Sequence, residues 1–310
     1  MSERVLLAVA TYRRPRGLAR LLAAIAALRL PEAVALSVAV VDNSPEGAAM
    51  SALAGGADHR FPLRVLHQPR RGLASARNTA LEAALAGGFG WLAFIDDDEV
   101  PGPGWLEAHW QALRHSGADA SMGAVHAAYL ATPPGWVRAG RFLEMRDFAD
   151  GARLRFGATS NILFSLHPVR ARGLRFDPAY DLTGGEDTAF FDAYRRVSRG
   201  IVFCAGAVVH ESVPPERATL RWLWRRWRRT GQTSGRIWMA RQGRLRRAGC
   251  TLGGLARIGG GLALALAGAA ARLGGEQVLW ARGVRAVARG CGFVDAALGR
   301  RTLEYARPAR

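Results

Sequence analysis

Apolar runs alternate with longer Ala- and Leu-rich segments along the first 115 residues. Four short, mostly apolar runs have the composition of buried strands and lie at 5–10, 36–41, 63–67 and 91–95. The segments between them, 15–28, 46–54 and 73–86, have the length and composition of helices. Apolar strands separated by helices are typical of a parallel sheet covered on both faces. The pattern therefore predicts an α/β fold with a mostly parallel sheet.

The middle of the chain is less regular. Strands are predicted at 119–127, at 158–165 and at 200–209, where the strand ends at His210, and a helix is predicted at 184–197. In open α/β sheets, ligands bind beyond the carboxyl ends of the strands. Three of the first strands end in polar residues: Thr11-Tyr12-Arg13, Asp42-Asn43-Ser44 and Asp96 to Glu99. We therefore expect the functional site at this edge of the sheet.

The composition changes abruptly at residue 216. The segment 217–241 places Leu220, Trp224, Trp227 and Trp238 near one face of a helix, with arginines over the rest. The following small and apolar segment is interrupted by Arg257, and its uninterrupted part, Ile258 to Ala271, has only fourteen residues. About 20 are needed to span a bilayer, so a transmembrane helix is not predicted. We expect a catalytic domain at 1–215 and a helical region at 216–310.

Most of the excess positive charge lies in this C-terminal region. The chain has 43 basic residues, all arginine, against 25 acidic ones, which gives a net charge of +18, and Arg217 to Gly275 holds 13 arginines without an acidic residue. A basic helix can be solvated, bind nucleic acid or lie on a membrane. Interleaved Trp and Leu favour an anionic membrane surface. The three cysteines fit neither a disulfide framework nor a zinc site and indicate a reducing compartment.

Four consecutive acidic residues, Asp96 to Glu99, follow the strand at 91–95. Such neighbours repel one another, so they tend to be protonated, paired with cations or bound to a metal. Mg²⁺ and Mn²⁺ prefer carboxylate oxygens and leave positions for water and for substrate phosphate. A metal held at a strand end would stabilise a diphosphate leaving group. A solvated acidic loop is the alternative interpretation.

Seven segments resemble family 2 glycosyltransferases in order and spacing: AVATYRRP, VAVVDNS, RGLASARNTALEAA, WLAFIDDDEVPGPGWLEA, GATSNILFS, GLRFDPAYDLTGGEDTAFFDAYRR and VVHESVPPER. The resemblance covers roughly residues 4–240. It implies a single nucleotide-binding α/β domain, the GT-A fold. It is strongest to bacterial enzymes that build exopolysaccharide or lipopolysaccharide on lipid carriers.

The resemblance also implies residues for donor and metal binding. Asp96 and Asp98 match the DxD element, with Asp98 the main metal ligand, Asp96 near the ribose and diphosphate, and Asp97 beside them. His210 matches a histidine near the metal, although a structural histidine is the alternative. The remaining donor-binding expectations concern the base and ribose (Thr11, Tyr12, Arg13), the uracil ring (Asp42), the nucleotide (Arg77) and the donor sugar (Asn161).

Glu186 and Asp187 match the family's ED element. The resemblance implies that Asp187 is the general base for the acceptor hydroxyl and that Glu186 orients it or contacts the acceptor. A single carboxylate opposite the leaving diphosphate is what an inverting displacement requires. Without the resemblance, both would be ordinary first-turn residues favoured by the helix dipole.

These expectations combine into one predicted function. The chain would be an inverting glycosyltransferase that uses Mg²⁺ or Mn²⁺, a nucleotide-sugar donor, most readily a UDP-sugar, and a lipid-linked or saccharide acceptor. It would act at the cytoplasmic face of a bacterial membrane, as a peripheral protein that does not bind nucleic acid. The alternatives are a nucleotidyltransferase and a non-enzymatic arginine-rich protein that binds nucleic acid or membranes. The first usually carries a glycine-rich loop where this chain has TYRRPRG, and the second leaves the acidic motifs without a role.

Overall fold

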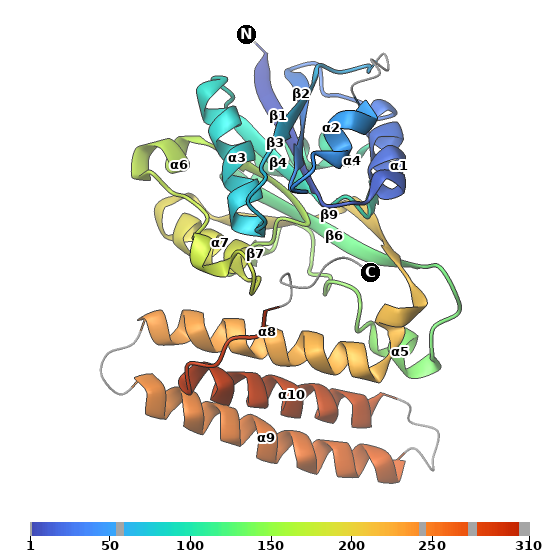
Figure 1. Ribbon diagram of the computed structural model, residues 1–310, viewed down its shortest axis with the longest axis vertical. Helices are drawn as coiled ribbons and strands as arrows, with labels where there is room; N and C mark the ends of the chain where they lie inside the picture. Colours follow the sequence, from blue (N-terminus) through green and yellow to red (C-terminus); the bar gives the residue numbers. More distant parts are fainter. Residues whose placement is uncertain (1, 54–58, 242–245, 272–277, 304–310) are drawn as a thin grey trace. The chain divides into compact units, whose positions relative to one another are not determined.

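The computed structural model describes residues 2–53, 59–241, 246–271 and 278–303 (Figure 1). Within these ranges the chain forms two compact units. The first contains the residues up to His126 together with Arg146–Glu211, and the second contains Ala127–Met145 together with the described residues from Ser212 to Leu303. The division at 211/212 lies close to the boundary expected at 215/216. The segment 127–145, expected in the catalytic domain, instead groups with the C-terminal helices.

The first unit is organised by a mixed sheet. Its strands, within the described residues, follow the order β3-β2-β1-β4-β8-β6-β9-β5, and β7 pairs with β9. The pairings among β1 to β4 are parallel, and those of β8 with β4 and β6 are antiparallel. The strands are β1 (Glu3–Thr11), β2 (Val34–Asp42), β3 (Leu63–His67), β4 (Trp91–Ile95), β5 (Glu99–Pro101), β6 (Ala120–Tyr129), β7 (Arg153–Leu154), β8 (Asn161–Ser165) and β9 (Ile201–Val213).

The predicted α/β class is confirmed, and the parallel arrangement holds for the first four strands. The strand predicted at 200–209 runs further, to Val213, so His210 lies inside β9 and not at its end.

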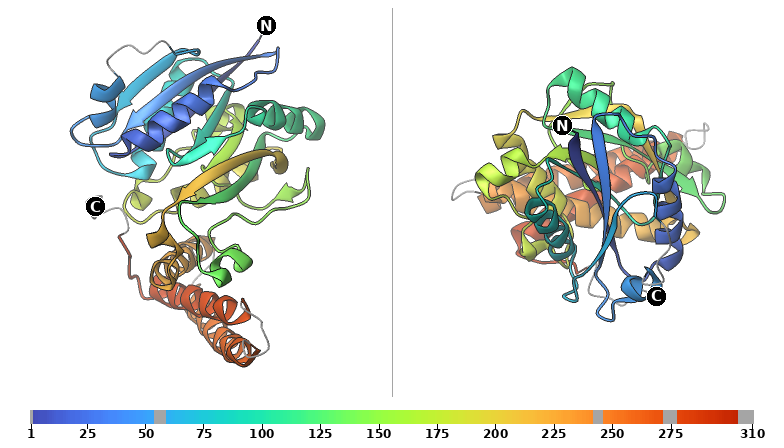
Figure 2. Two further views of the ribbon diagram at one scale, coloured as in Figure 1. Left: turned by 90° about the vertical axis from the view of Figure 1, so that its right-hand side faces the viewer. Right: turned by 90° about the horizontal axis from the view of Figure 1, so that it is seen from above.

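Helices cover both faces of the sheet (Figures 1 and 2). In both views α1 lies on one face and α3 on the opposite face. Leu18, Leu21 and Ile25 of α1 are buried at helical spacing, and Pro15 starts that helix where its missing N–H costs nothing. The helices are α1 (Pro15–Ala26), α2 (Ala48–Leu53), α3 (Leu73–Ala86), α4 (Trp105–Ser116), α6 (His167–Arg172) and α7 (Glu186–Val197), with a 3-10 turn at Pro178–Tyr180.

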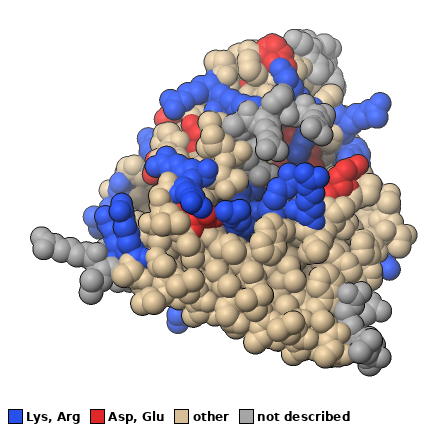
Figure 3. Space-filling view, turned by 60° about the horizontal axis from the view of Figure 1, so that its bottom comes forward, with Lys and Arg blue, Asp and Glu red and all other residues tan. Residues whose placement is uncertain are grey.

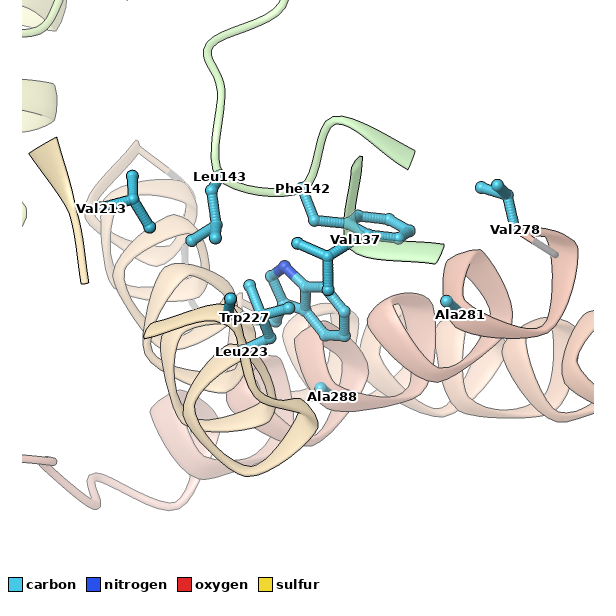
Figure 4. Close-up of a cluster of buried hydrophobic side chains, with 10 residues drawn as sticks. Val137, Phe142, Leu143, Val213, Leu223, Trp227, Val278, Ala281 and Ala288 are labelled. Carbon is cyan, nitrogen blue, oxygen red and sulfur yellow. The ribbon is translucent and has the colours of Figure 1, made fainter. Parts of the chain in front are cut away.

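The second unit is built from helices around its own apolar core (Figure 4). Its elements are α5 (Gly135–Gly140), a 3-10 turn (Pro215–Ala218), α8 (Leu220–Arg241), α9 (Arg246–Ala271) and α10 (Leu279–Ala297). Figure 4 shows the Trp227 indole of α8 beside Val137 and Leu223. The Trp227 ring also packs against the Phe142 ring, with centroids 5.2 Å apart.

This core corrects the interpretation of the tryptophan–arginine helix. Trp227 is only 4% exposed, and Trp224 packs against the same buried cluster. Those side chains cannot lie at the depth of lipid headgroups while they fill the interior of the unit. Of the four residues expected on the membrane face, only Leu220 and Trp238 are exposed. An apolar stripe looks the same in sequence whether protein or lipid covers it, so only the packing distinguishes the two.

Glycines allow α9 and α10 to pack closely. A Cβ added to Gly261 would lie 2.7 Å from the backbone nitrogen of Val287, and one added to Gly283 would lie 2.3 Å from that of Ala265. Both helices therefore need glycine at their contact, because any side chain there would push the backbones apart.

Candidate active site

The acidic turn after β4 is fastened to the end of β1. The two strands are parallel neighbours, so their carboxyl ends lie together. The Thr11 hydroxyl donates to Oδ2 of Asp97 at 2.8 Å. The Arg14 guanidinium donates to Oδ1 of Asp97 at 2.8 Å and to Oδ2 of Asp98 at 3.0 Å. Arg14 was not among the residues predicted from the sequence, because nothing in the pattern TYRR distinguishes it from its neighbours.

Burial raises the pKa of carboxyl groups in this turn. The pKa of Asp96 is raised to about 7, mainly by burial. The negative charges of Asp98 and Asp97 also raise it, whereas the positive charge of Arg77 lowers it. Glu99 is only 1% exposed, and burial raises its pKa well above the usual range. Its Oε2 accepts a hydrogen bond from the Asp96 backbone nitrogen at 2.8 Å, which closes the turn.

Arg77 connects the acidic turn with the ED motif. It lies on α3, is 6% exposed, and forms an ion pair with Glu186 at the start of α7. Its second guanidinium nitrogen lies 3.6 Å from Oδ1 of Asp96. One arginine therefore lies between two motifs that are 90 residues apart in the sequence. Its prediction as a residue near the nucleotide is compatible with this place and remains a prediction.

The ED motif begins α7. Gly184 and Gly185 precede it with φ of 71° and 95°, a backbone conformation that favours glycine. Glu186 is 1% exposed, and its Oε2 has no hydrogen-bond partner among the described residues. Asp187 is half-buried, and its Oδ1 accepts hydrogen bonds from the backbone nitrogen and the hydroxyl of Thr188. Among the described residues, none hydrogen-bonds to the other oxygen of Asp187.

Asp181 positions the start of α3. Its carboxylate accepts hydrogen bonds from the backbone nitrogen and the hydroxyl of Ser75, both at 2.7 Å. A Cβ on Gly72 would lie 2.2 Å from the Asp181 carboxyl carbon, so only glycine fits beside it. Ser75 is of a residue type that often caps a helix. Its hydroxyl instead donates to an aspartate 106 residues later, which no local capping rule could identify.

Arginines surround Tyr12, which follows β1. The Arg71 guanidinium lies 4.6 Å from the centre of the Tyr12 ring, and that of Arg13 lies 5.4 Å from it. Arg13 also forms two hydrogen bonds with the carboxylate of Glu46, at 2.6 and 2.9 Å. Tyr12 and Arg13 are thus held next to Thr11 at the edge where the donor was expected, and Arg71 joins them from another loop.

Asp42 has a structural role here. It is fully buried, and each of its oxygens accepts two hydrogen bonds: Oδ1 from the nitrogen and hydroxyl of Ser44, and Oδ2 from the nitrogens of Ala49 and Met50. These bonds use the four acceptor positions of a carboxylate. In this structure Asp42 fixes the loop before α2, with no acceptor left for the uracil ring that the resemblance suggested.

The Asn161 side chain likewise forms its hydrogen bonds within the protein interior. It is fully buried and donates to the carbonyls of Ala124 and Ala207. Its Oδ1 accepts from the Trp105 indole at 2.8 Å and lies 2.9 Å from Nε2 of His109. Since no hydrogen-bonding capacity remains for a donor sugar, the predicted sugar contact does not fit this arrangement. Burial lowers the pKa of His109 to about 4, so the ring is neutral.

His210 was expected near the metal. His210 is exposed; its ring centre lies 6.0 Å from that of His126, and its backbone pairs with Val100 on β5. No described group of three or more His, Cys, Asp and Glu side chains is arranged to hold a metal. Asp96 and Asp98 nevertheless supply the hard oxygen donors that Mg²⁺ and Mn²⁺ prefer. A divalent cation at Asp96 and Asp98, with or without His210, remains a prediction.

Comparison with known proteins identifies relatives. Residues 7–174 match the family Glycosyl transferase family 2. The Succinoglycan biosynthesis protein ExoM of Rhizobium meliloti (strain 1021) is 38% identical over 242 residues, which are 77% of each chain.

Solved structures share the fold. The crystal structure of S. aureus TarS 1-349 in complex with UDP aligns with a TM-score of 0.51 and 14% identity, over 97% of this chain and 92% of that one. The complex with UDP-GlcNAc gives 0.52 and 12%, over 97% and 93%. A further crystal structure of S. aureus TarS 1-349 aligns with this chain over 65% of its own length. At these identities the likeness concerns the fold.

Proposed function

Because the chain belongs to the family 2 glycosyltransferases, we propose that it transfers a sugar, with inversion, from a UDP-sugar to a lipid-linked or saccharide acceptor in the synthesis of a bacterial exopolysaccharide. The name of the ExoM relative supports the pathway class. The TarS complexes with UDP and UDP-GlcNAc support a UDP-linked donor. Within the chain itself, the placement of Arg77 between Asp96 and Glu186 carries the proposal, since it joins the donor motif to the acceptor motif.

The donor would bind at the carboxyl edge of β1 and β4. Thr11, Tyr12 and Arg13 would receive the base and ribose. Asp96 and Asp98 would hold Mg²⁺ or Mn²⁺, which when bound neutralises the departing diphosphate. Asp97 would position the turn, because its two oxygens already accept hydrogen bonds from Thr11 and Arg14.

The acceptor would approach from the side of α7. Asp187 would take the proton of the acceptor hydroxyl as that oxygen attacks the anomeric carbon and the bond to the diphosphate oxygen breaks. Asp187 is half-buried, and no described residue hydrogen-bonds to its Oδ2, so an acceptor hydroxyl could approach that oxygen. Glu186 would act as a positioning residue, since its carboxylate is already paired with Arg77.

A lipid-linked acceptor would place the reaction at the cytoplasmic face of the cell membrane. The second unit is strongly basic and contains α9, a helix whose length and composition would suffice to cross a membrane. Both features suit a protein that works at an anionic lipid surface.

The decisive experiment compares two charge-neutral variants in donor binding and in sugar transfer. Asp187→Asn should abolish transfer and leave the affinity for UDP-GlcNAc nearly unchanged, because the base touches only the acceptor. Asp98→Asn should abolish transfer and also weaken metal-dependent donor binding. UDP-, GDP- and dTDP-sugars, tested first for metal-dependent hydrolysis by the unmodified protein, identify the donor to use. Full transfer activity in either variant would refute the role assigned to that residue.

A further inference from the structure

Helix α9 has an exposed apolar face. Leu252, Leu255, Leu262 and Leu266 are 66%, 52%, 51% and 72% exposed. Their spacing of three, seven and four residues places them along one side of the helix. In a water-soluble surface helix this side would carry charged residues, so the stripe needs an explanation.

The opposite side of α9 packs on α10 through Gly254, Gly261 and Gly268. From Ala248 to Ala271 the single charged residue is Arg257. Its guanidinium lies 4.3 Å from the centre of the Phe293 ring of α10, and so points away from the leucine stripe. Figure 3 shows a broad area without charged side chains on the face turned towards the viewer. From Ala248 to Ala271 the exposed face is therefore apolar.

The neighbouring helix α10 supplies positive charge. Arg282, Arg285 and Arg289 follow one another at helical spacing, and none forms an ion pair with a described carboxylate. The pKa of Arg285 is lowered by burial and by the positive charges of Arg289, Arg226 and Arg282. An anionic surface beside these arginines would relieve their mutual repulsion.

Charge decides between the surfaces that could cover the leucines. Over 127–145 and 212–304, the second unit has 20 arginines and 5 acidic residues, a net charge of +15. A second copy of the chain would bring an equal positive charge to the contact. Nucleic acid would satisfy the arginines and leave the leucines in water. An anionic bilayer satisfies both, with headgroups for the arginines and acyl chains for the leucines.

We propose that α9 lies in the plane of an anionic bilayer, with Leu252, Leu255, Leu262 and Leu266 among the acyl chains and the α10 arginines at the headgroups. This inference rests on the proposed function, which places the acceptor on a lipid. Although α9 is long enough to cross a bilayer, α10 is packed along it, and a spanning α9 would take three arginines of α10 into the hydrocarbon.

Vesicle sedimentation of the full chain tests the partner. Vesicles of 30% phosphatidylglycerol in phosphatidylcholine should bind the protein, and vesicles of phosphatidylcholine alone should bind it at least tenfold more weakly. Leu255→Gln/Leu262→Gln/Leu266→Gln should weaken binding at least tenfold. Its matched control, Leu130→Gln/Leu298→Gln/Leu303→Gln, changes equally exposed leucines outside α9 and should bind normally.

Arginine variants test the charge. Arg282→Gln/Arg285→Gln/Arg289→Gln should reduce binding about 100-fold, since each surface arginine contributes roughly a fivefold change in affinity. Arg20→Gln/Arg64→Gln/Arg172→Gln removes the same charge from the first unit and should have a much smaller effect. If only the arginine variant loses binding, adsorption is purely electrostatic and the insertion of α9 is refuted.

Depth measurements test the orientation. Nitroxide spin labels at Leu252→Cys or Leu266→Cys, each in a Cys291→Ser background, report how far each position lies below the headgroups. The two positions are about 21 Å apart along the helix. Equal, shallow depths support the in-plane helix; a difference near 20 Å would show a spanning helix and overturn the proposal.

The outcomes separate this inference from the proposed function. Dimerisation that the leucine variant abolishes, without vesicle binding, would assign the face to a second copy and refute the bilayer. Loss of vesicle binding with intact UDP-sugar hydrolysis would refute only the membrane inference. Vesicle binding without donor binding or transfer would refute only the proposed enzyme.

Discussion

Arg77 and Glu186 form a buried ion pair although 109 residues separate them in the chain. Both side chains are less than one-tenth exposed. The pair holds the first turn of α7 against α3, and Arg77 also reaches Asp96 at the end of β4. Through this one arginine, the residues assigned to the acceptor and those assigned to the donor diphosphate share a site.

Removing one partner of this pair should destabilise the protein strongly. Arg77→Met leaves Glu186 buried without its cation, which should lower the free energy of unfolding by about 3–5 kcal/mol. Adding Glu186→Gln removes the uncompensated charge and should restore part of that loss. Urea unfolding of the two single variants and the double variant measures the coupling; strictly additive losses would mean that the two groups do not interact.

Arg14 should compete with a divalent cation for the acidic turn. It pairs with Asp97 and Asp98, and its side chain is 46% exposed, so the interaction is partly screened. Arg14→Gln should therefore raise the affinity for Mn²⁺ by about two- to fivefold. Calorimetric titration of Mn²⁺ without donor measures this, with Arg16→Gln, which changes an exposed arginine two residues away, as the control. Weaker Mn²⁺ binding in Arg14→Gln would show that Arg14 supports the metal.

His109 should make the fold sensitive to acid. Its pKa is about 4 in the native state and near 6.5 in the unfolded chain, so below pH 6.5 the unfolded chain takes up a proton that the native state refuses. The stabilisation is complete above pH 6.5 and is lost as the pH falls towards 4, by about 3 kcal/mol. Unfolding of His109→Gln between pH 7 and 4.5 should show a flatter pH dependence than the unmodified protein. Parallel curves would show that His109 is already protonated in the native state.

Replacing two glycines of α9 by alanine should change the stability of the protein in opposite directions. Gly261→Ala places a methyl group 2.7 Å from a backbone nitrogen of α10 and should destabilise by about 1–3 kcal/mol. Gly259→Ala meets nothing within 4 Å and should stabilise the helix by up to about 1 kcal/mol. Thermal unfolding of both variants tests the close packing of α9 on α10. Equal melting temperatures would refute it.

The sequence by itself determined the local elements and the acidic motifs. Hydrophobic periodicity located β1 to β4 and the helices between them, because burial on one face or both leaves its period in the chain. The resemblance placed Asp96, Asp98 and Asp187, whose surroundings in the structure suit their proposed roles without testing them.

Only the tertiary structure decided which surface each side chain meets. Asp42 and Asn161 are used up by hydrogen bonds to the protein interior, Arg14 joins the acidic turn, and Asp181 caps a helix 106 residues earlier. Trp227 and Trp224 of α8 pack against a protein core, whereas Leu252, Leu255, Leu262 and Leu266 of α9 are exposed. The physical reason is that periodicity records that a side chain avoids water, whereas its actual partner depends on contacts between segments far apart in the chain.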